Sequence, residues 1–188
     1  MTDSVGSQRK KIHPHKFTLW VALASIIMMF AGLTSAYIVK GSMPGWINIS
    51  LPKLFYYSTG AILLSSVTIQ LAEKAFKERN RPRYRSLMTV TVVLAIAFIV
   101  FQLYGFKELY NSGIKMEGSG AGQFLYIIFG LHILHVLGGM VALIVMFLKS
   151  YSGKIRSYNP VPIEVMTTYW HFVDFLWIYL FVFFLLKM

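Results

Sequence analysis

The sequence contains no cysteine and few acidic residues. The absence of cysteine excludes disulfide bonds, thiolate metal sites, iron–sulfur clusters and cysteine nucleophiles from this chain. Only 7 of the 188 residues are Asp or Glu, whereas 18 are Lys or Arg, and the formal net charge is +11. Such a charge can indicate nucleic-acid binding, but here the basic residues lie between hydrophobic segments. Membrane orientation explains that placement better, and we expect no nucleic-acid partner.

Hydrophobic residues make up 56% of the chain, and the mean hydropathy is +0.61. Five apolar segments each approach or exceed the roughly 20 residues that an α-helix needs to cross a bilayer. They cover residues 17–39, 54–76, 87–106, 124–148 and 163–186. The first is too long for the hydrophobic region of a signal peptide, so we interpret it as a retained helix. The sequence predicts an all-α integral membrane protein, a five-transmembrane-helix bundle over residues 17–188 that follows a basic N-terminal tail, residues 1–16.

The basic residues are unevenly divided between the two ends of these segments. Thirteen Lys and Arg residues lie in the N-terminal tail, the second connection and the fourth connection, and five lie on the opposite side. Cytoplasmic loops carry the excess of Lys and Arg in membrane proteins. We therefore predict a cytoplasmic N-terminus and a C-terminus on the outer, periplasmic side.

One face of the fifth segment is polar, although the rest of the segment is apolar. Glu164, Thr167, Thr168, His171 and Asp174 fall within roughly 120° of one another at the rotation of an α-helix. Asp174 lies almost at the centre of its segment, where insertion of a charge costs about 3 kcal/mol. A carboxyl group at such depth normally faces protein and finds a hydrogen-bonding or charged partner. We therefore expect a partner for Asp174 on a neighbouring helix.

The fourth segment offers candidate partners. His132, His135, Gly139 and Ala142 follow at spacings of three, four and three residues, which places them on one helical face. Glycine and alanine allow two helices to approach closely, so the histidines can reach across. His135 would lie at about the depth of Asp174 in an antiparallel pair. We predict that the two segments pack along these faces. The expected intramembrane polar network has its core at His132, His135, His171 and Asp174, with Glu164 near the cytoplasmic surface.

Other roles for these polar groups are open from the residues alone. Imidazole and carboxylate can bind haem iron, copper, zinc or manganese, although the paired Glu-x-x-His pattern of a di-iron bundle is missing. A proton relay through His171 and Asp174 would use the same residue types. We favour a static interhelical network and predict no catalytic or metal-ligating residue. The hydroxyls of Ser65, Ser66 and Thr68 are interpreted as helix-interface groups.

Two motifs in the last two segments carry a family resemblance. GLHILHVLGG at residues 130–139 and EVMTTYWHFVDFLW at residues 164–177 resemble subunit III of the haem-copper respiratory oxidases, the cytochrome c oxidase family. Further likeness at residues 30–37 and 63–76 extends it across all five segments. The chain looks like the short bacterial form, which lacks the two N-terminal helices of the seven-helix form. The matching motif positions are Gly130, His132, His135, Val136, Gly139, Glu164, Tyr169, Trp170, His171, Phe172, Val173, Asp174 and Trp177. Of these, packing positions are expected at Gly130, Gly139, Tyr169, Trp170 and Trp177.

The resemblance implies a subunit with no redox centre and no cofactor of its own. In such oxidases the haems and copper lie in partner subunits, and the complex reduces oxygen to water and pumps protons. Subunit III packs on catalytic subunit I, binds phospholipid and supports proton uptake. The implied location is the bacterial cytoplasmic membrane. The side left open by the two missing helices is available to another subunit or to a respiratory supercomplex. The alternatives are a proton-coupled transporter and a membrane protein that holds its own haem or metal.

The chain departs from the family pattern in the first and second spans. The first span of the family often has a buried glutamate after a serine, whereas Ser25 here is followed by Ile26. Glu73 and Lys74 stand where the second span usually ends in a double histidine. No role of the missing carboxylate can be carried over to this chain.

Overall fold

The chain folds into five long α-helices in the computed structural model, which describes residues 14–41, 51–113, 120–151 and 160–186. The helices are α1 (Pro14–Lys40), α2 (Leu54–Lys77), α3 (Arg81–Asn111), α4 (Gly120–Tyr151) and α5 (Val161–Leu186). Each is long and apolar enough to cross a membrane, and the described ranges contain no strand. The predicted five-helix membrane fold is confirmed. Most of the predicted basic tail, residues 1–13, lies outside the described residues.

The helices extend beyond the apolar segments that reveal them in the sequence. The segment predicted at 87–106 lies inside α3, which has 31 residues. At 1.5 Å per residue, α3 is about 47 Å long, whereas the hydrocarbon core of a bilayer is about 30 Å thick. Its start is set locally, because the Asn80 side chain accepts a hydrogen bond from the backbone N–H of Arg83 and Pro82 occupies the first turn. The polar ends of α3 therefore reach past the apolar layer.

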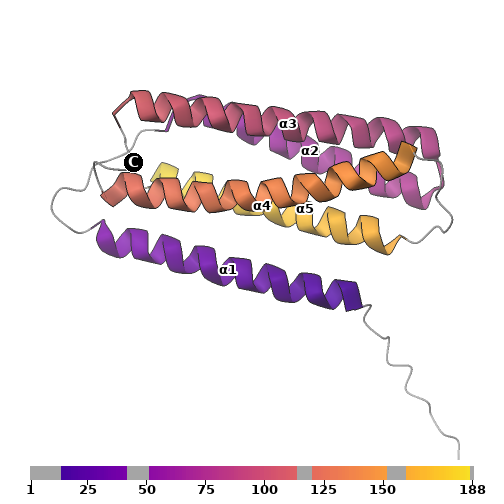
Figure 1. Cartoon of the computed structure of the whole chain (residues 1–188), viewed down its shortest axis with the longest axis horizontal. Helices are drawn as coiled ribbons and strands as arrows, with labels where there is room; N and C mark the ends of the chain where they lie inside the picture. Colours follow the sequence, from indigo (N-terminus) through magenta and orange to yellow (C-terminus); the bar gives the residue numbers. More distant parts are fainter. Residues whose placement is uncertain (1–13, 42–50, 114–119, 152–159, 187–188) are drawn as a thin grey trace, which may run out of the picture.

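Four of the helices form a closed ring, and α1 packs outside it. Contacts join α2 to α3, α3 to α4, α4 to α5, and α5 to α2. The first helix contacts only α4 and α5 among the described elements. Figure 1 shows α1 along the outer edge of the bundle, beside α4 and α5 and away from α3.

The two halves of the bundle interior differ in composition. Toward one end, aromatic rings fill the core: Phe55 stacks on Phe129 and Trp177 at ring-centroid distances of 5.6 and 5.9 Å. Toward the other end, the buried residues are mainly small or aliphatic, such as Ile69, Ala72 and Met88. Ser65, Thr91 and Thr167 add buried hydroxyl groups between the helices in this second half.

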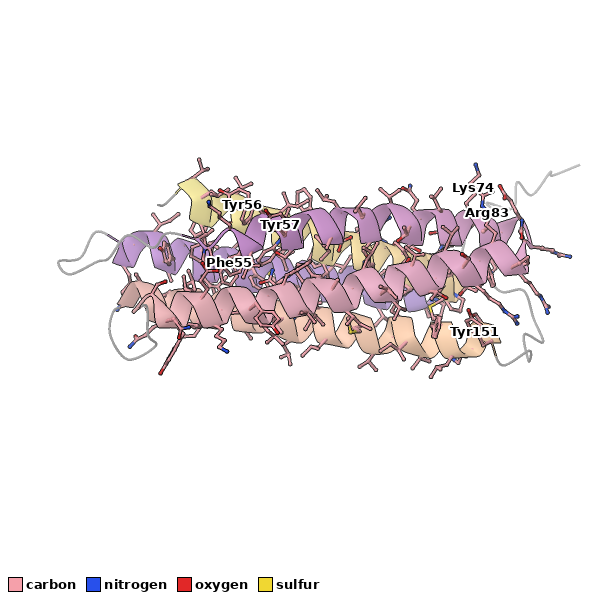
Figure 2. The ribbon with its side chains drawn as sticks, turned by 90° about the horizontal axis from the view of Figure 1, so that it is seen from above. Phe55, Tyr56, Tyr57, Lys74, Arg83 and Tyr151 are labelled. Carbon is pink, nitrogen blue, oxygen red and sulfur yellow. The ribbon has the colours of Figure 1, made fainter. Side chains whose placement is uncertain are left out.

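Most charged residues of the described chain gather at the end of the bundle opposite the aromatic half, whereas Lys40, Lys53, Lys107 and Glu108 lie at the aromatic end. The start of α1, the α2–α3 turn, the end of α4 and the start of α5 lie together at this end (Figure 1). Figure 2 shows Lys74, Arg83 and Tyr151 near it, and Phe55, Tyr56 and Tyr57 near the other. We call the first the basic end. In a chain of five crossing helices, the N-terminus and the second and fourth connections must lie on one side of the membrane, and these are the basic segments of the sequence. That this side is the cytoplasmic one stays a prediction.

Candidate functional site

The polar residues of α5 point mainly toward α2. Three side-chain hydrogen bonds join the two helices. Trp170 Nε1 donates to Ser65 Oγ at 3.0 Å, Trp177 Nε1 donates to Thr59 Oγ1 at 3.0 Å, and His171 Nδ1 lies 2.6 Å from Ser66 Oγ. Because the helices run antiparallel, these pairs form a polar seam along the α2–α5 interface. Ser65 and Ser66, which the sequence marks only as interface groups, are thus partners of motif residues on α5, as is Thr59, which the sequence does not mark. Thr68 bonds instead to Thr91 of α3 at 2.9 Å.

Asp174 lies one turn further along the same face of α5. Only 3% of the residue is exposed, and neither carboxyl oxygen has a hydrogen-bond partner among the described residues. The Ser66 hydroxyl is close enough to interact with the carboxyl, but outside good hydrogen-bond geometry. No described ion pair involves Asp174. The carboxyl is therefore shielded from lipid by protein yet lacks the imidazole partner expected from the sequence.

The two histidines of α4 lie apart from Asp174 in the hydrogen-bond pattern. His132 is fully buried, with its ring 5.3 Å from Trp177 and edge-on to Phe98 at 6.4 Å. Neither of its ring nitrogens has a hydrogen-bond partner in the part of the chain described. His135 Nδ1 lies 2.7 Å from the carbonyl oxygen of Leu131, one turn back in its own helix. A hydrogen bond between His135 and Asp174 is therefore not formed. Helical spacing shows which residues share one face of a helix, but it does not show which neighbouring helix that face contacts.

The expected close packing of α4 and α5 occurs at Gly139. A Cβ atom added there would lie 2.8 Å from Tyr169 Cε1 and 3.3 Å from Trp170 Cζ3. The Tyr169 hydroxyl donates a hydrogen bond to the carbonyl oxygen of His135 at 3.0 Å. Gly130 takes no part in this packing, since it faces outward and an added Cβ would meet nothing within 4 Å. Glycine at 139 thus allows the tyrosine ring to lie flat against α4.

Glu164 lies at the basic end and joins three helices. Its carboxylate forms ion pairs with Lys16 of α1 at 2.7 Å and with Lys77 of α2 at 3.0 Å. Lys77 also pairs with Glu73 at 2.7 Å. These side chains are part-exposed, so each pair contributes at most about 1 kcal/mol. The two lysines are functional neighbours that the motif analysis missed. Both lysines belong to the basic residues that flank the apolar segments, and this pattern is the sequence signal that could have identified them.

Two cavities lie near this end of the bundle. The first, of about 680 Å³, is an apolar groove between α1, α4 and α5. Its lining includes Leu19, Ala22, Ala142, Val165 and Tyr169. The second, of about 540 Å³, is a polar cleft between α2 and α5 that ends at His171. One cavity therefore suits an apolar ligand and the other suits water or polar groups.

No three of the described His, Asp and Glu side chains come together as a metal-binding group. His132 packs on aromatic rings, His135 bonds to its own helix, and His171 bonds to a serine. The arrangement can hold helices together and can hold or pass a proton, because imidazole, hydroxyl and carboxyl groups meet along the seam.

The five apolar helices and the seam between α2 and α5 define a multi-pass α-helical membrane protein. The model of the family "Cytochrome c oxidase subunit III" matches residues 15–187, which include all five helices except the first residue of α1. The chain therefore belongs to that family.

Relatives of the chain come from several bacteria. A cytochrome c oxidase subunit 3 from Corynebacterium diphtheriae is 31% identical over 170 residues, which is 86% of this chain and 82% of that protein. A probable cytochrome c oxidase subunit 3 from Nocardia farcinica is 30% identical over 164 residues, covering 85% of this chain and 81% of the relative. A probable quinol oxidase subunit 3 from Staphylococcus epidermidis is 24% identical over 184 residues, covering 95% and 92%. The family thus includes chains named for both kinds of oxidase.

Proposed function

We propose that this chain is the non-redox subunit III of a proton-pumping haem-copper oxidase in a bacterial cytoplasmic membrane. The family match across residues 15–187 is the observation that carries the proposal. In this role the chain packs on the catalytic subunit, binds phospholipid and supports proton uptake and stability of the complex. The haems and copper belong to the partner subunits, and oxygen reduction takes place there.

The outer surface of the bundle supports assembly inside a membrane. Large apolar side chains of α1 are strongly exposed, among them Phe17 at 62%, Trp20 at 63% and Met28 at 71%. Exposed apolar surface of this kind requires lipid or another membrane protein as its neighbour. We propose that the catalytic subunit covers part of the bundle and that a further subunit or respiratory supercomplex covers another part.

Co-purification tests the assembly. The full chain with an affinity tag, isolated from its own membranes in mild detergent, should bring a haem-containing catalytic subunit that consumes oxygen. The tagged chain freed of its partners should show no haem absorption and no stoichiometric copper. A haem spectrum that stays with the isolated chain would contradict the proposal, as would purification without any oxidase subunit.

Deletion of the chain tests its contribution to proton uptake. An oxidase isolated from cells that lack the chain should keep its haem spectrum but take up protons more slowly and lose activity sooner during turnover. A complex whose proton uptake and durability are unchanged would show that the chain does not support either.

We propose that the apolar groove between α1, α4 and α5 binds phospholipid. Its wall is almost free of polar side chains, and it opens on a surface that faces the bilayer, so an acyl chain fits its chemistry. Ala142→Phe places a ring in the groove and should lower the amount of phospholipid retained by the purified complex. Val141→Phe is the matched control, because Val141 is exposed and does not line the groove. Equal phospholipid retention by the two variants would count against a lipid site here.

A further inference from the structure

The cleft between α2 and α5 is polar, although it lies on a membrane bundle and is open on its outer side, where Val67 and Leu71 of its lining are 55% and 39% exposed. Its α2 wall carries Gln70, Glu73, Lys74 and Lys77, and its α5 wall carries Thr167, Thr168 and His171. Lys74, at the basic end in Figure 2, marks its outer part. A cavity of about 540 Å³ with this many donors and acceptors holds several waters, since one water takes about 30 Å³. The cleft therefore provides an aqueous entrance from the basic end.

This entrance reaches well into the apolar layer. His171 is ten residues beyond Val161, the first residue of α5, which corresponds to about 15 Å along the helix. Asp174 is one turn deeper, close to the middle of the 26-residue helix. The cleft stops at His171, and Asp174 does not line it. A proton that moves between the cleft and the carboxyl must therefore pass through side chains.

The side chains between them are proton-carrying groups, and one link, from Ser66 Oγ to the Asp174 carboxyl, is not a formed hydrogen bond. His171 Nδ1 lies 2.6 Å from Ser66 Oγ, and the same hydroxyl interacts with the Asp174 carboxyl. His171 lines the cleft, and no hydrogen bond to its Nε2 atom is found among the described residues. An imidazole can take a proton on one nitrogen and give one from the other, and a hydroxyl can accept and donate at once. The order of groups is water, imidazole, hydroxyl and carboxyl.

Burial and the absence of a counter-ion favour the proton-bound form of Asp174. An ionised carboxyl at 3% exposure without a cation or a complete set of hydrogen bonds is strongly disfavoured in an apolar interior. The charged and titratable groups nearest this region come from every helix that packs on α5. They are Glu73, Lys74 and Lys77 on α2, His132 and His135 on α4, and Lys16 on α1. Lys16 and Lys77 are held by Glu164 at the surface, and the two histidines of α4 make the separate contacts described above.

From this geometry we propose that Asp174 is a proton-binding site that exchanges with water at the basic end through His171 and Ser66. On entry, a hydronium ion in the cleft gives its proton to His171 Nε2 and leaves as water, the Nδ1 proton moves to Ser66 Oγ, and the Ser66 hydroxyl proton moves to the Asp174 carboxylate. The imidazole is then neutral again and carries its proton on Nε2 instead of Nδ1. Release follows the same steps in reverse, so the chain gains or loses one proton in total, and His171 and Ser66 return to their starting forms. The site belongs to this chain alone and goes beyond the proposed function, since it requires no oxidase partner.

Infrared spectroscopy of the full chain in phospholipid vesicles tests the site directly. A protonated carboxylic acid has a carbonyl band separate from the amide bands, and the band shifts when water is replaced by D₂O. In the unmodified chain this band should be present and should shift after the exchange. Asp174→Asn should remove it, which assigns the band to this residue.

Two variants then test the path. Ser66→Ala and His171→Gln should keep the band but slow its shift by on the order of a hundredfold, the low end of what one positioned proton-transfer group contributes. Glutamine can still bond to Ser66 but has no pair of ring nitrogens to relay a proton. Ser65→Ala is the matched control, because Ser65 is the neighbouring buried hydroxyl and bonds to Trp170 instead. It should exchange at the rate of the unmodified chain.

Each contrary result overturns the proposal at a defined step. The absence of a band that depends on Asp174 would show that the carboxyl does not hold a proton. Unchanged exchange in both Ser66→Ala and His171→Gln would show that the proton takes another route. Equal slowing by Ser65→Ala would show that opening of the helix interface sets the rate. His171→Gln keeps a hydrogen-bonding side chain, so it gives the decisive measurement if Ser66→Ala does not fold.

Discussion

Substitution of Gly139 by alanine tests the packing of α4 on α5. The added Cβ would lie 2.8 Å from Tyr169 Cε1, closer than such carbon atoms approach one another, and 3.3 Å from Trp170 Cζ3. Neither ring can move aside freely. Trp170 is 1% exposed, and the Tyr169 hydroxyl is bonded to the backbone of His135. We expect the two helices to move apart or the tyrosine to give up its hydrogen bond.

The size of the effect follows from opposing contributions. Overpacking of this kind costs about 1–3 kcal/mol, and loss of the tyrosine hydrogen bond costs about 1 kcal/mol. Alanine is the better helix former by about 1 kcal/mol, which offsets part of the loss. The free energy of unfolding should therefore fall by about 1–3 kcal/mol for Gly139→Ala. The measurement is unfolding by a denaturing detergent from mild-detergent micelles, followed by circular dichroism.

Gly138→Ala is the matched control for this experiment. Gly138 is adjacent in the same helix, but a Cβ there would meet nothing within 4 Å. Only the helix-propensity gain remains, so its stability should stay the same or rise by up to about 1 kcal/mol. If the two variants unfold within about 0.5 kcal/mol of each other, the close approach at Gly139 does not stabilise the bundle and the reasoning fails.

Three further substitutions test the contacts that join the helices. Trp170→Phe removes the indole donor to Ser65 and should lower the free energy of unfolding by about 1–2 kcal/mol; a smaller loss in the Ser65→Ala background, measured as a double-mutant cycle, would confirm the coupling. Tyr179→Phe removes the 2.9 Å hydrogen bond to Thr34 that ties α1 to α5, so α1 should become easier to cleave by protease, and unchanged cleavage would show that apolar packing alone holds it. Glu164→Gln should cost less than about 1 kcal/mol at low salt and nothing measurable at high salt, because its two lysine pairs are part-exposed; a loss that persists in salt would contradict a surface role.

The number and type of the helices could be predicted because each crossing segment must be apolar over its full length. Their ends were less accessible, since hydropathy detects the part of a helix that lies in hydrocarbon. The start of α3 at Arg81 depends on Asn80 and Pro82, which are capping signals outside the apolar run. Local hydrogen-bonding chemistry extends the helix beyond the apolar run, by six residues at this end.

The partners of the polar motif residues could not be predicted in the same way. Helical periodicity correctly places His171 and Asp174 on one face, but it does not fix how each helix is rotated within the bundle. That rotation depends on side chains from four helices at once, such as the stack of Phe55, Phe129 and Trp177. It turns the polar face of α5 toward Ser65 and Ser66 of α2. Gly139 was easier to predict, because a glycine within an apolar helix face has few purposes other than close packing.

The difference between the aromatic half and the basic half has an electrical consequence. Densely stacked rings polarise weakly, whereas a water-accessible cleft lined by hydroxyls and charged groups polarises strongly. A voltage across the bilayer therefore drops mainly over the aromatic half, at about 2.3 kcal/mol for each elementary charge per 100 mV. His171, at the inner limit of the cleft, would share nearly the potential of the solution at the lysine-rich surface. An ion or proton that reaches this histidine has moved about 15 Å along α5, somewhat less than half of the helix, while performing little electrical work.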